Sequence, residues 1–167
     1  FETCNNSRLS ACAIGLNFVK NNTVVHSSKH FIQPPTPAPF FTRPLDLPGI
    51  TFDDVEYSMN FKELWDFEFS KYFTENLIVF HNASMELSIL KNLFEHYEIS
   101  PYKISYIDTM LFADKLGYPK KLTDLARTLN IEIKQHHDPE SDAETCSFIF
   151  GELIDKYPNY KELIRTI

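Results

Sequence analysis

The sequence has no long apolar run, no CxxC pair and little positive charge, and each absence excludes a class of protein. No stretch approaches the roughly 18 apolar residues of a membrane-spanning helix, so we expect no membrane association. Three cysteines, Cys4, Cys12 and Cys146, are odd in number and form no recognisable pair. This is typical of thiols that serve as small apolar residues in a reducing compartment, and we therefore expect a cytoplasmic protein.

Positive charge is scarce, because 16 Lys and Arg residues stand against 23 Asp and Glu residues, which gives a net charge of −7. A chain this acidic is not expected to bind nucleic acid tightly through charge alone. An enzyme that meets nucleic acid through metal ions is still allowed, because carboxylates that hold cations count as negative. The chain is 43% hydrophobic over 167 residues, which suffices for one domain with a sizeable core.

The first third of the chain predicts strands followed by a loop. Two apolar runs, 11–19 and 23–32, flank the turn residues Lys20-Asn21-Asn22, and this pattern predicts a β-hairpin. The first few residues are expected to pair with it as another strand. Residues 33–48 contain six prolines, and such a segment predicts a surface loop, because proline cannot donate to a central ladder.

From Asn60 onwards the hydrophobic spacing is mostly that of helices. The expected elements are a helix over 61–73, a strand at 77–80, a helix after Asn82, a strand at 104–107, and helices ending near 116, over 122–129, from 139 to about 155 and from Pro158 onwards. This order predicts an α/β or α+β fold with a mixed sheet covered by helices on both faces. No linker or repeat interrupts it, so residues 1–167 are expected to form a single domain.

The segment His137-Asp138-Pro139-Glu140-Ser141-Asp142 predicts the beginning of a helix that presents an imidazole beside a carboxylate. Asp138 is the N-cap candidate, and Pro139 suits the first helical position, where its missing N–H costs nothing. His137 then takes the position before the cap and Asp142 the fourth helical position, which meet in a hydrophobic staple. Taken alone, the segment also fits a solvated helix cap with a surface histidine.

Two further carboxylates occupy comparable places. Glu2 is expected in a strand at the start of the chain, and Glu86 takes the fourth helical position if Asn82 is the N-cap. Glu86 and Asp142 then both lie near helix N-termini, where the macrodipole favours negative charge. Each acid alone fits a solvated surface residue, but their joint occurrence with His137 favours metal-assisted hydrolysis.

Three segments, Phe1-Glu2-Thr3, His81-Asn82-Ala83-Ser84-Met85-Glu86 and the segment from His137 to Asp142, follow one another in an order that resembles the DEDDh exonuclease family. That family includes the proofreading subunits and domains of bacterial replicative DNA polymerases, such as DNA polymerase III. Three supporting segments match as well: Leu47-Pro48-Gly49-Ile50-Thr51, Tyr106-Ile107-Asp108-Thr109 and Lys121-Leu122. The resemblance covers essentially the whole chain.

The resemblance implies a ribonuclease H-like α/β fold with a mixed central sheet flanked by helices. It also implies 3′→5′ removal of nucleotides from single-stranded DNA with two Mg²⁺ or Mn²⁺ ions, and a DNA polymerase subunit or domain as a partner. His137 would be the general base, a role that suits an imidazole. The remaining implied site residues are the metal ligands Glu2, Glu86 and Asp142, and the nucleotide contacts Thr3, His81 and Asn82.

The chain departs from the family pattern at two places. The aspartate expected immediately before Phe1 is absent, and with it the first half of its strand, so we expect a truncated N-terminal strand. Glu86 stands where the family has aspartate, and one more methylene moves the carboxylate by roughly 1.5 Å. A displacement of about 1 Å at a catalytic site can cost on the order of 10²-fold in rate.

These departures leave other interpretations open. The chain could be a degenerate exonuclease fold that serves as a nucleic-acid or protein interaction module, or an RNA-directed exonuclease of the same family. The pair His136-His137 with Asp138 could form a separate metal site, although three adjacent loop residues rarely converge on one ion. Asp108 is interpreted as the cap of the helix that follows it.

Overall fold

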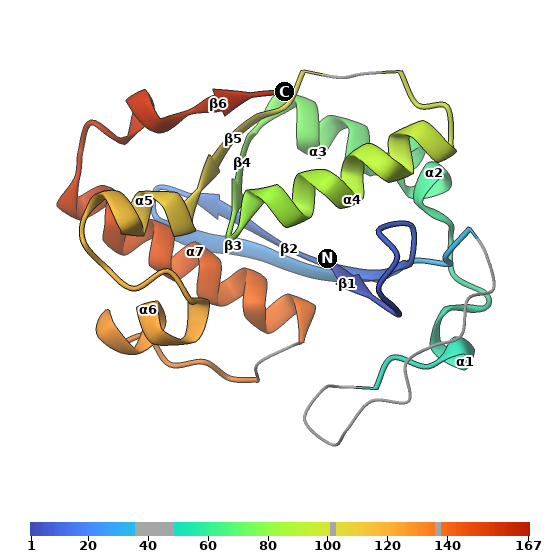
Figure 1. Cartoon of the computed structure of the whole chain (residues 1–167), viewed down its shortest axis with the longest axis horizontal. Coiled ribbons are helices and arrows are strands. Elements are labelled where there is room, and N and C mark those ends of the chain that lie inside the picture. The colour runs from blue at the N-terminus through green and yellow to red at the C-terminus, as the bar shows by residue number, and fades with distance from the viewer. Residues whose placement is uncertain (36–48, 101–102, 136–137) are drawn as a thin grey trace.

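The computed structural model describes residues 1–35, 49–100, 103–135 and 138–167. Along the chain (Figure 1) the elements are β1 (Glu2–Thr3), β2 (Ala11–Lys20), β3 (Thr23–Phe31), α1 (Phe52–Val55), α2 (Phe61–Leu64), η1 (Trp65–Phe69), α3 (Ser70–Glu75), β4 (Leu77–Phe80), α4 (Ala83–His96), β5 (Ser105–Asp108), α5 (Thr109–Lys115), α6 (Leu122–Thr128), α7 (Pro139–Lys156), η2 (Tyr160–Leu163) and β6 (Arg165–Thr166). Within the described residues, no helix is both long and apolar enough to cross a bilayer.

The N-terminal strands form an antiparallel sheet in the order β1-β2-β3. The predicted hairpin is confirmed: Lys20 pairs with Thr23 across the two-residue turn of Asn21 and Asn22. Both turn residues have positive φ, 51° and 62°, as a type I′ turn requires, and asparagine tolerates this conformation. The expected pairing of the first residues is confirmed as well, because β1 runs antiparallel to β2.

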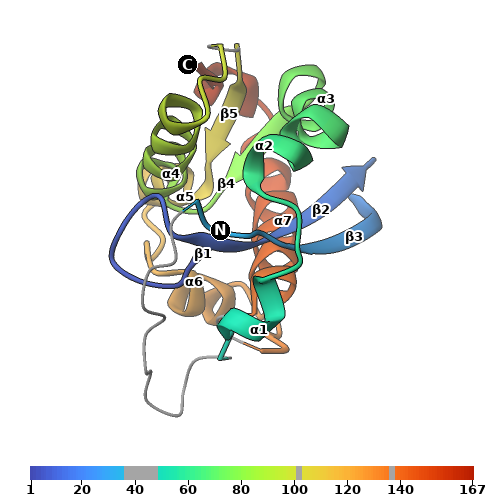
Figure 2. The ribbon, with the colours of Figure 1, turned by 90° about the vertical axis from the view of Figure 1, so that its right-hand side faces the viewer.

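The second sheet has the order β4-β5-β6. β4 and β5 are parallel, with Phe80 opposite Asp108 at their carboxyl ends, and β6 is antiparallel to β5. The mixed α/β class is therefore confirmed, but the described strands form two three-stranded sheets, whose strands run in different directions (Figure 2). The two-residue strand β1 pairs with β2.

Helices cover both faces, as the sequence predicted. Consecutive residues of a strand point to opposite faces, and in β5 Tyr106 and Ile107 belong to different cores. Tyr106 packs in the core formed with α2, η1, α3 and α4. Ile107 packs in the core formed with α5, α6 and α7. Figure 1 shows these two groups of helices on either side of β4 and β5.

The expected helix over 61–73 is confirmed, and it contains a π-helical turn at Trp65–Phe69. Four aromatic residues at a spacing of four, Phe61, Trp65, Phe69 and Phe73, are at most 2% exposed. In an α-helix a spacing of four drifts by about 40° per step around the axis. A wider turn absorbs this drift, so all four rings stay on the buried face.

Three differences from the sequence prediction concern short elements. The four-residue helix α1 was not expected, and neither was β6, a strand of only two residues. Elements this short carry too few residues to show a hydrophobic period. The terminal helix expected from Pro158 is a 3₁₀ turn, η2, which begins at Tyr160. Most of the proline-rich segment, residues 36–48, lies outside the described residues.

Candidate active site

Three predicted carboxylates come from three elements and act on one atom, the amine nitrogen of Phe1. Glu2 lies in β1, Glu86 in the first turn of α4 and Asp142 in the first turn of α7. Glu86 Oε2 accepts a hydrogen bond of 3.0 Å from the Phe1 amine. Burial acts to lower the pKa of this amine, but Glu86, Glu2 and Asp142 outweigh it and raise the pKa. The three acids therefore lie close enough to this amine for their charges to act on it.

The buried thiol of Cys146 lies near the same acids. It follows Asp142 by one helical turn on α7. The pKa of Cys146 is raised to about 12, mainly by burial and also by the charges of Glu86, Asp108 and Asp142, against the effect of a hydrogen bond with Thr109. An anion is unfavourable in an apolar site surrounded by carboxylates, so this thiol stays protonated at neutral pH. Two of the acids whose charges act on this thiol, Glu86 and Asp142, also act on the Phe1 amine.

Glu86 owes its place to the start of α4. Asn82 is the N-cap as predicted, and Glu86 is therefore the fourth helical residue. The predicted capping by the Asn82 side chain is wrong, because Asn82 is left-handed, with φ 67°, and makes no side-chain cap bond. Its amide oxygen accepts from the Ser84 hydroxyl instead, at 2.8 Å. The carboxylate of Asp108 accepts from the backbone nitrogens of Asn82 and Ala83.

Asp142 owes its place to the start of α7, where the sequence prediction is confirmed. Asp138 is the N-cap and accepts from the Ser141 backbone nitrogen at 3.0 Å, with Pro139 as the first helical residue. Lys29 of β3 pairs with Asp138 at 2.8 Å. Burial acts to raise the pKa of Asp138, but the bonds from Lys29 and Ser141 dominate and lower it. The start of the helix is thereby attached to the hairpin.

Gly15 of β2 allows α7 to approach closely. A Cβ atom at this position would lie 1.9 Å from the Pro139 carbonyl oxygen and 2.6 Å from the Glu140 nitrogen. Both neighbours are backbone atoms, so neither can move without displacing the helix. Only glycine leaves the space that this approach needs. The Pro139 end of α7 therefore rests directly on the strand.

Two of the predicted nucleotide contacts, Thr3 and His81, differ in their surroundings. Thr3 follows Glu2 in β1 and is half-buried. His81 is directed inward, since its Nδ1 lies 2.9 Å from the Thr109 hydroxyl oxygen. That hydroxyl donates to the Phe80 carbonyl at 3.0 Å, which leaves its oxygen lone pairs to accept from His81 Nδ1. Burial lowers the pKa of His81, although Asp108 and Asp142 act to raise it.

His137, the predicted general base, lies outside the described residues, as does His136. Among the residues that are described, no group of three or more His, Cys, Asp and Glu side chains is arranged to hold a metal ion. Glu86 nonetheless accepts a hydrogen bond from the Phe1 nitrogen at 3.0 Å, and the charges of Glu2 and Asp142 act on the same atom. Carboxylate oxygens are the ligands that Mg²⁺ and Mn²⁺ prefer, so the donor set fits such an ion.

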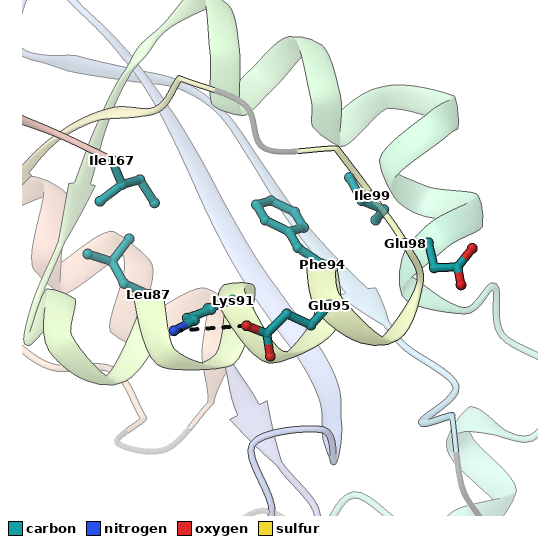
Figure 3. A pocket seen from close by; sticks show the side chains of 7 residues that line it. All are labelled: Leu87, Lys91, Phe94, Glu95, Glu98, Ile99 and Ile167. Carbon is teal, nitrogen blue, oxygen red and sulfur yellow. Dashed lines mark ion pairs between the residues drawn. The ribbon is translucent and has the colours of Figure 1, made fainter.

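An apolar pocket of about 620 Å³ lies away from the three acids, on the outer side of α4 (Figure 3). It is lined by Leu87, Lys91, Phe94, Glu95, Glu98, Ile99 and Ile167. Figure 3 shows Lys91 and Glu95 paired along the rim, with 3.9 Å between the charged atoms. Its carboxylates do not converge on one point, so the acids around Phe1 form the better candidate site.

Sequence reasoning missed two residues that organise this site, Gly15 and the second role of Asp108. A glycine within an apolar strand signals a close backbone approach, so Gly15 could have been singled out. Asp108 caps α5 as predicted, by accepting from the Met110 nitrogen at 2.9 Å. Its bonds to the start of α4 span 25 and 26 residues, and no local pattern in the sequence indicates them.

Comparison with known proteins places this geometry in context. A family model described as the RNase_H superfamily matches residues 53–152. The DNA polymerase III PolC-type of Listeria innocua is 29% identical over 140 residues, covering 81% of this chain and 9% of that protein. The protein of the same name from Streptococcus pneumoniae is 28% identical over 134 residues, covering 76% and 9%. The chain thus spans about a tenth of the length of these relatives.

Solved structures share the fold. The nuclease domain of 3′hExo, a DEDDh family member bound to rAMP, matches with a TM-score of 0.74 and 14% identity over 93% of this chain and 88% of that one. Exonuclease X in complex with 5′ overhanging duplex DNA matches with a TM-score of 0.71 and 18% identity, covering 94% and 89%. The ribonuclease H-like α/β fold implied by the resemblance is confirmed.

Proposed function

This chain belongs to the RNase H superfamily, and from that premise we propose that it is a metal-dependent 3′→5′ exonuclease of the DEDDh type. Its proposed reaction is hydrolysis of the phosphodiester bond at the 3′ end of single-stranded DNA. The observation that carries the proposal is the convergence of Glu2, Glu86 and Asp142 on one buried nitrogen. Carboxylates gathered in this way repel one another unless a cation lies among them.

Glu2, Glu86 and Asp142 are the proposed ligands of two Mg²⁺ or Mn²⁺ ions. When bound, such ions polarise the phosphodiester and make a bound water easier to deprotonate. The protein's part is to fix the three acids on separate, well-anchored elements. Glu86 and Asp142 each lie one turn into a helix, so the backbone sets the direction from which each carboxylate approaches.

His137 is the proposed general base, which takes a proton from the attacking water. An imidazole titrates near neutral pH, which suits this role. His137 directly precedes Asp138, the N-cap of α7, so the same helix start carries both the base and the Asp142 ligand. Thr3 and Asn82 are the proposed direct contacts to the terminal nucleotide. His81 is proposed to support these two contacts indirectly, through its hydrogen bond with Thr109.

DNA is the proposed substrate because the curated relatives are DNA polymerases. The proposed partner is accordingly a DNA polymerase subunit or domain. Exonuclease X was solved with DNA, whereas a third match concerns 3′-end specific recognition of a histone mRNA stem-loop. An RNA-directed exonuclease of the same type is therefore the nearest competing substrate assignment. The cytoplasmic location and the single-domain organisation remain predictions.

A 3′-labelled single strand of DNA, and its RNA counterpart, test the proposal in Mg²⁺ and in Mn²⁺. The chain is assayed as it stands and with an aspartate added before Phe1, as DEDDh exonucleases have there. We expect release of labelled mononucleotide, faster from DNA, and faster with the added aspartate. His137→Ala should abolish release, while His136→Ala should retain it. An unchanged rate in His137→Ala would exclude His137 as the base.

The second candidate function is a binding module built on a degenerate exonuclease fold. It is favoured by one observation, the glutamate at position 86 where DEDDh exonucleases have aspartate. The same assay separates the two functions. A module would bind the single strand without releasing nucleotide in either metal, and Glu86→Asp would not create activity.

A further inference from the structure

A buried polar network joins the carboxyl ends of β4 and β5, and the catalytic roles proposed above do not use its central residues. β4 ends at Phe80 and β5 ends at Asp108, which are paired in register. Ligand sites of parallel sheets commonly lie beyond these strand ends. Asp108 is only 7% exposed and Thr109 is fully buried, so neither is a surface residue placed there for solubility.

Asp108 accepts hydrogen bonds from the starts of two helices. Its Oδ1 accepts from the Met110 nitrogen of α5 at 2.9 Å and from the Asn82 nitrogen at 3.2 Å. Its Oδ2 accepts from the Ala83 nitrogen, the first residue of α4, at 3.0 Å. A buried carboxylate is costly unless its lone pairs are satisfied. Three charge-assisted bonds at two helix N-termini meet that requirement.

Thr109 holds Phe80 and His81, the two residues that precede the N-cap of α4. Its hydroxyl donates to the Phe80 carbonyl at 3.0 Å and accepts from His81 Nδ1 at 2.9 Å. Together, Asp108 and Thr109 therefore contact each of the four residues from Phe80 to Ala83. We call this set of five hydrogen bonds the β4–β5 clamp; it includes the bond from Asp108 to Met110.

The clamp replaces the cap that α4 does not make for itself. Asn82 turns the chain in the left-handed region and makes no side-chain cap bond. The direction of the first helical turn is thus determined by a neighbouring strand. Glu86 lies one turn further along the helix, and its Oε2 accepts a hydrogen bond of 3.0 Å from the Phe1 amine. A tilt of the helix start would move this carboxylate away from Glu2 and Asp142.

We propose that Asp108 and Thr109 are positioning residues, which fix the first turn of α4 and so hold the Glu86 carboxylate at the metal site. This inference rests on the proposed function for its metal-binding part. Groups that orient metal ligands typically change metal affinity or activity by 10–100-fold when mutated. The proposal therefore predicts a loss in metal affinity, beyond any loss in stability.

The test compares Asp108→Asn with a capping variant elsewhere. Asparagine keeps the shape but turns an N–H toward the backbone donors, so the bonds to Asn82 and Ala83 cannot all form. We expect the apparent affinity for Mn²⁺, measured by electron paramagnetic resonance without substrate, to fall about tenfold. Asn60→Ala is the control, because Asn60 caps α2 by accepting from the Glu63 nitrogen at 3.0 Å. It should lower the melting temperature and leave Mn²⁺ affinity within about twofold.

Thr109 provides a second comparison that does not depend on Asp108→Asn folding. Thr109→Val removes the hydroxyl and should weaken Mn²⁺ binding, whereas Thr109→Ser retains the hydroxyl and should restore it. Unchanged Mn²⁺ affinity in both Asp108→Asn and Thr109→Val would overturn the inference and leave both residues as stability determinants only.

Amide hydrogen exchange distinguishes this failure from failure of the proposed function. If the unsubstituted chain neither binds Mn²⁺ nor cleaves, the proposed function and the metal-binding part of the inference both fail. Exchange in the first turn of α4 still reports on the clamp in that case. Faster exchange at residues 83–86 in Asp108→Asn, but not in Asn60→Ala, would support the structural part, and equal exchange would overturn it.

Discussion

Glu86 acts on two buried groups near the candidate site, the Phe1 amine and the Cys146 thiol. Its Oε2 accepts from the Phe1 amine, and its charge helps to raise the pKa of the Cys146 thiol. The sequence identified this residue from its position in a helix start, which the structure confirms. What the sequence could not give is the effect of the extra methylene, because that depends on where the backbone of α4 begins.

Replacing Glu86 with glutamine tests its role as a ligand. The substitution keeps the shape and removes the charge, so we expect weaker Mn²⁺ binding and cleavage slower by on the order of 10²-fold, about 3 kcal/mol of transition-state stabilisation. Single-turnover cleavage at several Mn²⁺ concentrations measures both effects. Glu95→Gln is the control on the same helix, since Glu95 only pairs at the surface with Lys91. Equal rates in the two variants would contradict the assignment.

The thiol of Cys146 predicts a pH dependence of stability. Its pKa rises from 9.0 in the unfolded chain to about 12 in the folded protein. The unfolded chain therefore loses this proton first, and the free energy of unfolding falls as pH rises from about 9 toward 12. Below pH 9 the contribution is fully present.

Thermal unfolding of the parent chain and of Cys146→Ala from pH 8 to 11 measures this contribution. We expect the stability difference between the two proteins to shrink above pH 9, by up to about 1.4 kcal/mol per pH unit. Other groups titrate in the same range, but they cancel in the difference. A constant difference across the range would mean that the thiol ionises as easily in the folded protein as in the unfolded chain.

At the scale of elements, the approach of α7 to β2 depends on Gly15. We expect Gly15→Ala to push the Pro139 end of the helix away, because its Cβ would lie 1.9 Å from a backbone oxygen. Overpacking of this kind costs about 1–3 kcal/mol, and a shift of about 1 Å at Asp142 would slow cleavage on the order of 10²-fold. Thermal unfolding and the 3′-end assay measure the two effects.

Gly49→Ala is the matched control for this prediction, because a Cβ at Gly49 would have no neighbour within 4 Å among the residues that the structure describes. It should change neither stability nor rate by a measurable amount. A Gly15→Ala protein with normal stability and normal cleavage would show that the start of α7 can shift without affecting the site.

The elements that were predicted correctly have local causes. The hairpin follows from two asparagines that tolerate positive φ, and the start of α7 follows from Asp138 and Pro139. The errors concern structure fixed from a distance. Asn82 is the N-cap of α4 but makes no side-chain cap bond, and Asp108, on the next strand, supplies the acceptor. The π-helical turn at Trp65–Phe69 keeps four aromatic rings in one core, which the spacing alone did not indicate.

At the scale of the whole molecule, the sequence motifs and the fold agree on one arrangement. Glu2, Glu86 and Asp142 are far apart in the sequence, and the topology brings their elements to one end of β1, α4 and α7 around Phe1. The order of the motifs predicts that these three acids share one site, and that assignment stays a prediction. The anchoring of α7 at Gly15 and of α4 at Asp108 is visible only in the structure. Hydrophobic periodicity predicted the helices and strands, but it did not indicate that the described strands divide into two three-stranded sheets.

The net charge of −7 determines how the molecule can meet a nucleic acid. Without metal ions, an acidic protein repels phosphates, and three carboxylates at the site add to this repulsion. Bound divalent ions would reverse the sign locally and bridge the protein to the 3′ end. We therefore expect single-stranded DNA to bind at least tenfold more tightly in Mg²⁺ than in EDTA.

Filter binding with His137→Ala, which should bind without cleaving, measures this difference. In EDTA we expect weak binding, and in Mg²⁺ a shallow dependence on salt, because few lysines and arginines are available to release counterions from the strand. Replacing Mg²⁺ with the same ionic strength of NaCl controls for screening. Tight binding in EDTA with a steep salt dependence would place the nucleic-acid contact on a basic surface and separate it from the three acids.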